Sequence, residues 1–334
     1  MSQPAAPGRN RFSRFLLRTL LPALSVVGML AHAPAAHAQF SKMVVLSDSM
    51  SDTHRFYDFT KATLGTGYPA PPAYEGRFCN GPVAVEVLAK HLGIQIENYS
   101  FSGALSGYLT LVAIPMGVLS QVTEHLNRKS PVPSIPTVPL VGDVFNYIPG
   151  TGKADPKALY VIWTGPDDYY FPGGMNDLTA YKAAANIQQA ITTLYGAGAR
   201  YFFIPTMPDL SITPRAAQLD KTRPGYITRA ATYSKQFSDV LTQALASSRN
   251  RYPQAKIMSF DTLPFLKAEM EKARAQGKNV TEACHPGGLN LTQFEPSPVC
   301  ANPDDYLFWD DNHPTAEANR ILGNAWLGSI TARP

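Results

Sequence analysis

Short strand-like runs alternate with helix-like segments along most of this chain, and this alternation constrains the fold more than any other feature. The runs, which are rich in apolar residues, lie at 43–46, 94–98, 158–163, 201–204 and 256–260. Runs of this length, bounded by polar residues or by glycine and proline, are typical of strands buried in a parallel sheet. The pattern therefore predicts an α/β fold, a three-layer α/β/α sandwich in which a mostly parallel five-stranded sheet lies between two layers of helices. No linker or internal repeat divides the chain, so we expect a single domain over residues 39–334.

The segments between these strands have apolar residues at helical spacing. Helices are expected at 53–64, 80–93, 176–195, 227–248, 263–275 and 315–330. Residues 105–126 are expected to be only partly helical, because Pro115 lies inside them. Two other stretches are too rich in proline and glycine for regular structure. Residues 68–78 form an aromatic loop, and residues 130–156 are a candidate lid or surface insertion.

The first 38 residues differ from the rest of the chain. They contain four arginines and no acidic residue, then an apolar run that Pro22 interrupts, and finally Ala36-His37-Ala38. This order is typical of a secretory signal peptide that is cleaved after Ala38. The alternative, an uncleaved membrane anchor, is disfavoured because the apolar run is short for a membrane span. We therefore expect export, either to the periplasm or to the medium.

The charge balance argues against one class of partner. The four arginines of the leader account for the formal net charge of +4, since they leave 25 basic against 25 acidic residues. No basic tract remains, so nucleic acid is not an expected partner. The histidines of the mature chain do not form a ligand-spaced set, so we expect no metal. Nothing in the sequence requires a cofactor.

Export permits disulfide bonds. Cys284 and Cys300 flank a loop that is rich in proline and glycine, and they are the expected pair. Cys79 is then expected to be a buried free thiol. If the protein stayed in the cytosol instead, all three cysteines would be reduced core residues.

Two segments carry residues that are suited to nucleophilic catalysis. Ser49 follows the first expected strand, and ligands of open α/β sheets bind outside the carboxyl ends of the strands. Asp310 and His313 lie three residues apart, just before the last expected helix. A serine nucleophile needs a base, and the base needs a carboxylate that fixes its tautomer. Each segment alone has a simpler explanation, because serine and aspartate often cap helices and Asp-x-x-His pairs occur in many loops.

Together with three further motifs, these segments resemble the SGNH/GDSL hydrolase family, in particular its secreted bacterial branch of lecithinases, haemolysins and lipid acyltransferases. The motifs are Asp48-Ser49-Met50, Glu75-Gly76-Arg77-Phe78-Cys79-Asn80-Gly81-Pro82, Gly165-Pro166-Asp167-Asp168, Pro208-Asp209-Leu210 and Asp310-x-x-His313. The resemblance covers nearly all of residues 42–330 and implies the flavodoxin-like fold of that family. It also implies that Ser49 is the nucleophile, that His313 is the base and that Asp310 orients the base.

The resemblance further implies an oxyanion hole made by the N–H of Ser49, by Gly103 and by a third donor that is asparagine in the family. Here Asp167 replaces that asparagine. An amide donates a hydrogen bond, whereas an ionised carboxylate only accepts one and repels an oxyanion. Three outcomes follow: Asp167 is protonated and donates, it points away and leaves a slower enzyme, or the protein has become a binding protein. Because Ser49, Gly103, Asp310 and His313 are retained, we expect one of the first two outcomes.

These inferences lead to one expected function, an exported serine ester hydrolase of the esterase, lipase or phospholipase type that acts through an acyl-enzyme on Ser49. A lipid acyltransferase would use the same site, and carbohydrate O-deacetylases have the same family fold. A non-catalytic binding protein is the alternative from another class. Aromatic residues of two loops, including Tyr74, Phe78 and Tyr169, are candidate substrate contacts or simple packing. We expect a monomer with a small-molecule or lipid ester as substrate and transient contact with a membrane surface.

Overall fold

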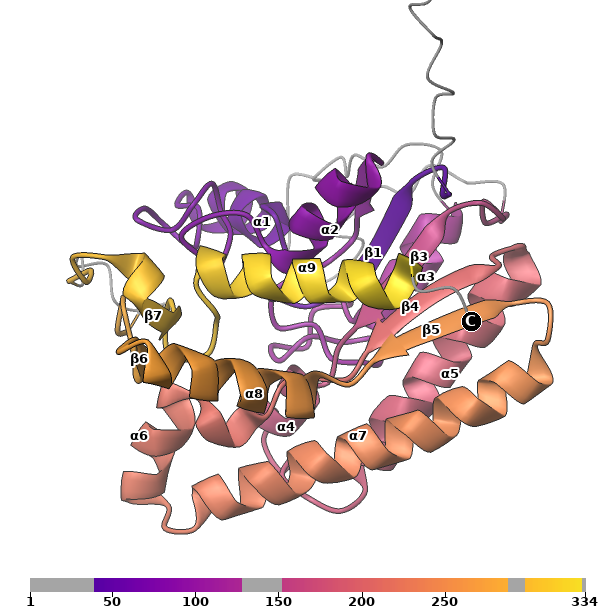
Figure 1. The fold of residues 1–334 in the computed structure, drawn as a ribbon. Coiled ribbons are helices and arrows are strands. Elements are labelled where there is room, and N and C mark those ends of the chain that lie inside the picture. The colour runs from indigo at the N-terminus through magenta and orange to yellow at the C-terminus, as the bar shows by residue number, and fades with distance from the viewer. Residues whose placement is uncertain (1–38, 128–151, 288–297, 332–334) are drawn as a thin grey trace, which may run out of the picture. The chain divides into compact units, whose positions relative to one another are not determined.

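The computed structural model describes residues 39–127, 152–287 and 298–331, which contain a central sheet of five parallel strands (Figure 1). The strand order is β2-β1-β3-β4-β5. The strands are β1 (Met43–Ser47), β2 (Ile96–Asn98), β3 (Leu159–Trp163), β4 (Tyr201–Pro205) and β5 (Lys256–Phe260). The predicted α/β fold with a five-stranded parallel sheet is therefore confirmed. The predicted signal peptide, residues 1–38, and most of the predicted 130–156 insertion lie outside the described residues.

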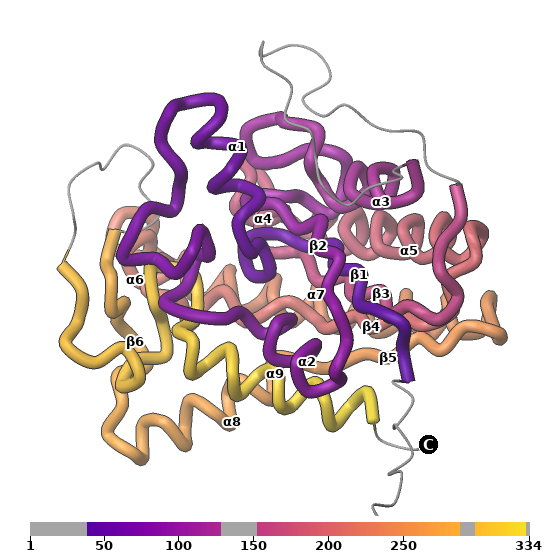
Figure 2. Tube along the Cα trace, turned by 90° about the horizontal axis from the view of Figure 1, so that it is seen from above, coloured from indigo at the N-terminus to yellow at the C-terminus, as the bar shows by residue number. Residues whose placement is uncertain are grey.

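Helices cover both faces of this sheet. The α-helices of the described residues are α1 (Arg55–Leu64), α2 (Ala84–Leu92), α3 (Val118–Asn127), α4 (Pro166–Tyr170), α5 (Thr179–Ala197), α6 (Pro214–Thr222), α7 (Tyr226–Arg251), α8 (Thr262–Ala275) and α9 (Ala316–Thr331). Successive residues of β1 point to opposite faces, as the pleat of a strand requires. Val44 and Leu46 lie in the cluster formed with α3, α5 and α7, whereas Met43 and Val45 lie in the cluster formed with α2 and α9. Figure 2 shows these two groups of helices on opposite sides of the strands.

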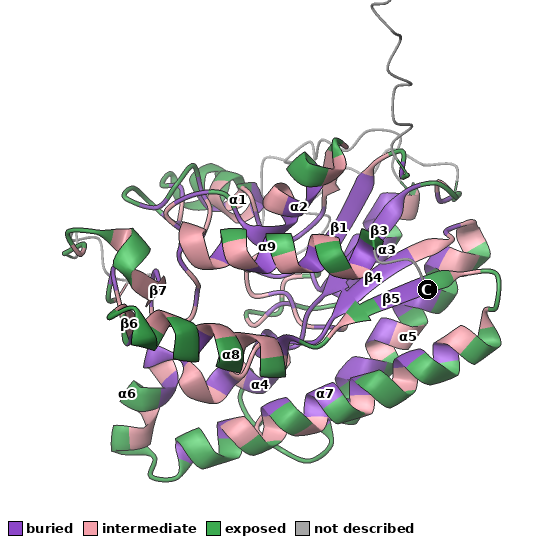
Figure 3. Ribbon diagram, in the orientation of Figure 1, coloured by how far each residue is buried: buried purple, intermediate pink, exposed green. Residues whose placement is uncertain are grey.

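The two central strands carry the most deeply buried segments of the core. All five residues of β1 and all five of β3 are buried, and these strands appear purple in Figure 3. Trp163 at the end of β3 packs edge-on against Trp326 of α9, with 4.9 Å between the ring centroids. Burial of each large apolar side chain contributes about 1.5–3 kcal/mol. The end of β3 and the last helix are therefore firmly joined beside the carboxyl edge of the sheet.

The strand order reverses beside β1. The chain goes from β1 to β2 on one side and then crosses to β3 on the other side. A crevice forms where connections leave a parallel sheet in opposite directions, and ligands of open α/β sheets bind there. The segments that leave β1 and β3 at this point begin with Asp48-Ser49 and with Thr164-Gly165, respectively.

Several predicted helix boundaries are wrong for identifiable reasons. Helix α2 begins at Ala84, not at Asn80, because Pro82 disfavours helical backbone in the residue before it and the Glu86 carboxylate accepts the N–H of Val83. Residues 105–126 are partly helical, as expected: helix α3 begins at Val118, beyond Pro115. The sequence does not predict the short helices α4 and α6. Each begins with a proline after a strand or a turn, and a proline in that position is also typical of a loop.

A second, two-stranded parallel sheet of β6 (Asn279–Ala283) and β7 (Tyr306–Phe308) was also not predicted. The expected disulfide joins Cys284, directly after β6, to Cys300, and Cys79 is a buried free thiol. The N–H groups of Cys284 and His285 donate to the carbonyls of Phe308 and Trp309. This small sheet therefore holds the start of the segment that leads to His313. Among the described residues, no helix is long and apolar enough to cross a membrane.

Candidate active site

The turn after β1 presents Ser49 without using it as a helix cap. The Asp48 carboxylate accepts the N–H of Met50 at 3.0 Å. The Asp52 carboxylate accepts the N–H groups of His54, Arg55 and Phe56, which are donors at the start of α1. Asp52 thus fills the capping role that was the simpler explanation for this Ser- and Asp-rich turn. The hydroxyl of Ser49 is left for another partner.

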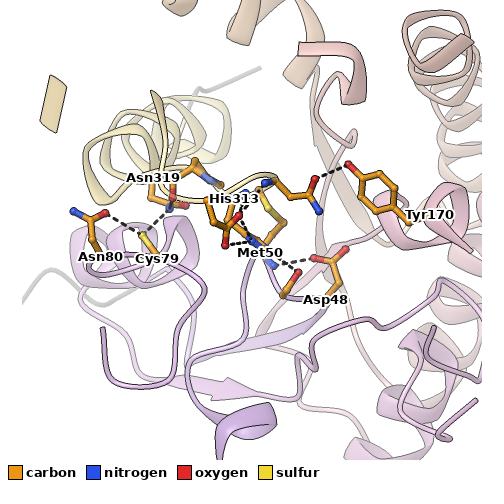
Figure 4. Close-up of polar contacts among 11 residues, drawn as sticks. Asp48, Met50, Cys79, Asn80, Tyr170, His313 and Asn319 are labelled. Atoms are coloured by element: carbon orange, nitrogen blue, oxygen red, sulfur yellow. Dashed lines mark hydrogen bonds and ion pairs between the residues drawn. The ribbon is translucent and has the colours of Figure 1, made fainter. Parts of the chain in front are cut away.

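That partner is His313, which lies across the carboxyl edge of the sheet. The Nε2 atom of His313 is 2.8 Å from the Oγ of Ser49, and its Nδ1 is 2.8 Å from both carboxylate oxygens of Asp310. Figure 4 shows His313 between the turn that holds Asp48 and Met50 and the start of α9. Because the Asp310 carboxylate holds the proton on Nδ1, Nε2 is the atom that accepts the serine hydroxyl proton.

Asp310 is arranged to remain an acceptor. Its side chain is 2 % exposed, and Oδ1 also accepts the N–H groups of Asn312 and His313 at 2.8 Å each. These hydrogen bonds fold residues 310–313 into a tight turn that brings the imidazole back over its own carboxylate. The three-residue spacing seen in the sequence is the spacing that this turn requires.

A segment distant in sequence supports the base. The Asn80 carboxamide accepts the N–H of Ala316, the first residue of α9, at 2.8 Å. The Asn319 side chain contacts the Sγ of Cys79 and accepts the N–H of Ala84 (Figure 4). The Phe78 ring packs against the His313 ring, with 4.9 Å between centroids. Sequence reasoning identified this segment as a motif but did not assign these positioning contacts, which only the folded chain reveals.

Two residues that line the cavity have backbone N–H groups with no hydrogen-bond partner among the described residues. Ser49 and Gly103 both line the cavity, and neither N–H donates a hydrogen bond within the described parts of the chain. Gly103 has φ +77°, a conformation that favours glycine. The predicted oxyanion-hole residues Ser49 and Gly103 therefore lie together, with free donors.

The Asp167 carboxyl group is buried at the start of α4. It lines the cavity and is 7 % exposed, and its Oδ2 atom has no hydrogen-bond partner among the described residues. Burial, and then the neighbouring Asp48 and Asp168, raise the pKa of Asp167 well above its usual value, while Arg215 acts in the opposite direction. Loss of hydration and nearby like charge both disfavour the carboxylate.

Asp48 and Asp168 share this environment. Burial raises the pKa of Asp48 to about 7 and that of Asp168 to about 6. Asp168 has its own donors, since it accepts the N–H and the O–H of Ser106 at 2.9 and 2.7 Å. In the part of the chain that the structure describes, no comparable donor favours the ionised form of Asp167. Of the adjacent pair in the Gly-Pro-Asp-Asp motif, Asp168 is therefore the structural residue and Asp167 the one exposed to the cavity.

The cavity has a volume of about 250 Å³ and is bordered mainly by apolar side chains. Its apolar wall includes Phe56, Tyr68, Phe78, Leu111, Val112, Leu210, Ile212, Leu266 and Leu307. Of the three predicted substrate contacts, Phe78 lies in this wall. Tyr74 and Tyr169 are not among the lining residues. Tyr74 lies under the guanidinium of Arg77, and Tyr169 packs in the core against Tyr233 and Phe237, so the next residue, Tyr170, faces the cavity instead.

Within the residues that the structure describes, no group of three His, Cys, Asp or Glu side chains is placed to hold a metal ion. The polar groups around Ser49 are instead a base, its carboxylate and hydrogen-bond donors. A serine hydrogen-bonded to a histidine–aspartate pair, at the carboxyl edge of a parallel sheet and beside an apolar cavity, is the arrangement of an ester hydrolase.

Comparison with known proteins identifies the family. Residues 44–326 match the sequence model of the GDSL-like lipase/acylhydrolase family, and the chain belongs to this family. It is a carboxylic ester hydrolase with the SGNH-type fold that its motifs resemble.

The chain is similar to several members of this family over nearly its whole length. It is 26 % identical to the GDSL esterase/lipase APG of Arabidopsis thaliana, with 95 % of this chain and 97 % of that protein covered. It is 25 % identical to the phosphatidylcholine-sterol acyltransferase of Aeromonas hydrophila, with 90 % and 92 % covered. Among solved structures, Est24, a carbohydrate acetylesterase from Sinorhizobium meliloti, matches with a TM-score of 0.44 at 13 % identity, covering 86 % of this chain and 97 % of that one.

Proposed function

We propose that this chain is an exported serine ester hydrolase that cleaves acyl esters through an acyl-enzyme on Ser49. The observation that carries this proposal is the unbroken hydrogen-bonded series from Ser49 Oγ through His313 to Asp310, with 2.8 Å at each step. The mature enzyme is residues 39–334, a single domain and a monomer, released from the signal peptide in the periplasm or the medium. The disulfide between Cys284 and Cys300 is compatible with that location.

The reaction has two halves. Ser49 Oγ attacks the ester carbonyl carbon while His313 Nε2 takes its proton, and the carbonyl oxygen becomes an oxyanion facing the N–H groups of Ser49 and Gly103. His313 then protonates the departing alkoxide, which leaves the acyl group on Ser49. In the second half, water attacks the acyl carbon and gives a proton to His313. The bond between the acyl carbon and Ser49 Oγ then breaks, His313 returns the proton to Oγ, and the acid is released. Asp310 stays ionised throughout and stabilises the imidazolium.

The acyl group is proposed to occupy the apolar part of the cavity. The wall that includes Phe78, Leu111 and Val112 offers no charged side chain to a hydrocarbon chain. Burying each methylene there contributes about 0.8 kcal/mol. The cavity opens beside a loop on which Tyr108, Leu109 and Val112 are exposed, which supports transient contact with lipid at a membrane surface.

Asp167 is proposed to act as the third oxyanion donor in its neutral form. Its burial, its unpartnered oxygen and its place in the cavity wall support this role. A carboxylic acid that burial keeps neutral can donate a hydrogen bond to an oxyanion, as an amide does. There are two alternatives. In the first, Asp167 contributes no donor and only the two backbone N–H groups stabilise the oxyanion. In the second, the ionised carboxylate prevents catalysis and the protein is a binding protein.

A second candidate function, acyl transfer to an alcohol, uses the same acyl-enzyme. It is favoured by the similarity to a phosphatidylcholine-sterol acyltransferase over 90 % of this chain. In that case an alcohol replaces water in the second half of the reaction. Adding a long-chain alcohol during turnover, and measuring ester product against free acid, separates the two functions.

The test is hydrolysis of p-nitrophenyl butyrate by the mature protein beside the Ser49→Ala variant. We expect the variant to lose about 10⁴-fold or more in kcat. Ser51→Ala is the matched control, because Ser51 lies in the same turn and its Oγ has no hydrogen-bond partner among the described residues. Labelling by a fluorophosphonate probe should follow the same pattern. Equal activity in Ser49→Ala and the wild-type protein would exclude the proposed mechanism.

A further inference from the structure

Among the described residues, one cationic side chain, that of Arg215, borders the cavity, and it has no counter-ion there. Arg215 is the only lysine or arginine among the described residues that line the cavity. Its Nε atom is buried without a hydrogen-bond partner, and the side chain forms no ion pair within the parts of the chain that the structure describes. Buried N–H donors of arginine side chains are ordinarily paired, because an unpaired donor loses its hydrogen bonds to water without gaining another partner. The vacant donors of Arg215 point to a ligand as their partner.

The guanidinium is held in a defined orientation. Its carbon lies 5.0 Å from the centre of the Tyr170 ring, in a cation–π contact. A cation–π contact of this kind occupies no oxygen or nitrogen acceptor, so the N–H groups of the guanidinium stay available for a ligand. Tyr170 is itself fixed, since its hydroxyl donates to Oδ1 of Asn312 at 3.2 Å (Figure 4). A planar fork of donors held in this way matches a pair of oxygens on a phosphate or a carboxylate.

The position of Arg215 places it on the alcohol side of the substrate. Its backbone N–H donates to the carbonyl of Asp311 at 2.9 Å, so Arg215 and Tyr170 both pack against the turn that ends at His313. His313 must protonate the leaving oxygen, and the alcohol part of the ester therefore lies beside this turn. Arg215 interacts electrostatically with the carboxyl groups of Asp167, which lines the cavity, and Asp311, but within the described residues it forms an ion pair with neither.

Resting on the hydrolase function proposed above, we propose that Arg215 forms a subsite for an oxyanion carried by the alcohol part of the ester. The substrates that fit are acyl esters of alcohols that bear a phosphate or a carboxylate. Tyr170 is the positioning residue of this subsite, because it holds the guanidinium plane against the His313 turn. The subsite selects among esters by the leaving group and is separate from the apolar wall that receives the acyl chain.

Three esters that share the butyryl group and a three-carbon alcohol test the subsite. They are 1-butyrylglycerol, which is neutral, 1-butyrylglycerol 3-phosphate and 3-butyryl glycerate. We expect the wild-type protein to have a higher kcat/KM for one or both anionic esters, and the two anionic arms show whether phosphate or carboxylate is the better ligand. In Arg215→Gln the ratio of anionic to neutral kcat/KM should fall about 10- to 100-fold, as expected for a lost charge-assisted hydrogen-bond pair. Arg215→Lys keeps the charge but loses the planar set of donors, so its ratio should lie between those of the wild-type protein and Arg215→Gln.

Arg223→Gln is the matched control, because Arg223 is an exposed residue at the end of the same helix and its replacement removes the same charge. We expect its ratio to equal that of the wild-type protein. An equal fall in Arg223→Gln would show that net charge is responsible rather than contact, and an equal loss on all three esters in Arg215→Gln would assign Arg215 to another role. An unchanged ratio in Arg215→Gln would also overturn the proposal. Thermal unfolding of each variant identifies any that fails to fold.

A binding measurement keeps this inference distinct from the hydrolase proposal. Glycerol 3-phosphate and glycerate are titrated by calorimetry into Ser49→Ala and into Ser49→Ala with Arg215→Gln. Weaker binding in the double variant supports the subsite even if no ester is turned over, whereas equal affinity overturns it. Failure of the hydrolase proposal is visible separately, as the absence of Ser49-dependent hydrolysis of the neutral ester.

Discussion

The side-chain oxygen of Asn80 accepts a hydrogen bond from the backbone N–H of Ala316, across 236 residues of sequence. This contact caps helix α9 from outside its own chain segment, because the N–H groups of the first turn of a helix have no partner within the helix. His313 lies three residues before the capped position. The segment that contains Asn80 therefore has a role in setting the position of the base.

We predict that Asn80→Ala loses about 1 kcal/mol of unfolding free energy and several-fold in kcat, with little change in KM. The stability cost follows from the lost cap, and the rate cost follows from the freer His313 turn. Urea unfolding and steady-state kinetics with p-nitrophenyl butyrate measure both. Asn80→Asp keeps the accepting oxygen and should retain most of both quantities. A variant that loses stability but keeps its full kcat would show that the cap does not position the base.

We predict that Asp310→Asn folds normally and loses about 10³- to 10⁴-fold in kcat. An amide cannot stabilise the imidazolium, and it favours the tautomer whose proton is on the wrong nitrogen. Asp311→Asn is the adjacent control, since the Asp311 carboxylate accepts from Gln218 at the exposed side of the turn. We expect a change of less than tenfold there. Similar losses in the two variants would mean that the turn, and not the Asp310 carboxylate, is what matters.

We predict that Asp167→Asn raises kcat/KM at neutral to alkaline pH, by up to about 10²-fold, and changes it little in mild acid. Burial raises the pKa of Asp167, so the acid form donates at low pH and is lost as pH rises through that pKa. The amide donates at every pH. The measurement is a pH–rate profile of both proteins from pH 5 to 9. If the asparagine variant is slower across this whole range, the carboxyl group has a function other than donation.

We predict that the protein is more stable in mild acid than at pH 8. The folded-state pKa values of Asp48 and Asp168 are about 7 and about 6, against an ordinary value of 3.8, and that of Asp167 is also raised. At pH values between the ordinary pKa and the raised pKa of each group, the folded state holds a proton that the unfolded state has lost. The unfolding free energy therefore falls as pH rises from about 4 to 7, by at most about 1.4 kcal/mol per pH unit for each carboxyl group.

Urea unfolding at pH 5, 6, 7 and 8 measures this slope. Glu97, whose pKa is lowered to about 2, acts in the opposite direction but only below its ordinary value of 4.5, outside the range measured. Asp167→Asn removes one of the carboxyl groups whose pKa is raised and should flatten the curve. Equal slopes in the variant and the wild-type protein would show that Asp167 is ionised in the folded state.

The sequence predicts the central sheet well because β1, β3 and β4 are short runs whose apolar side chains need burial on both faces. It does not predict β6, where Asn279-Val-Thr-Glu-Ala is polar and is a strand only because β7 pairs with it from beyond the disulfide loop. Strand formation of that kind depends on a long-range partner, which local propensity does not contain.

The same distinction applies to the site. Ser49, Asp310 and His313 are found from motifs, since each belongs to a local turn with a required spacing. Arg215 carries no local signal, because its importance comes from the cavity around it. Tyr169 and Tyr170 show why the sequence does not predict which of two adjacent side chains faces the cavity. Successive helical residues differ by about 100°, so the start of α4 at Pro166 decides which tyrosine reaches the cavity and which one packs in the core.

Ser49 and His313 meet although 264 residues separate them, and α9 must be docked on α2 before they can. A growing chain in which Ser49 has been synthesised but His313 has not contains a nucleophile without the base that activates it. For the exported protein proposed here, catalysis begins only when translocation and docking of the last helix are complete. The order of residues along the chain therefore separates the synthesis of the nucleophile from that of its base, and an incomplete chain lacks the pair that ester cleavage needs.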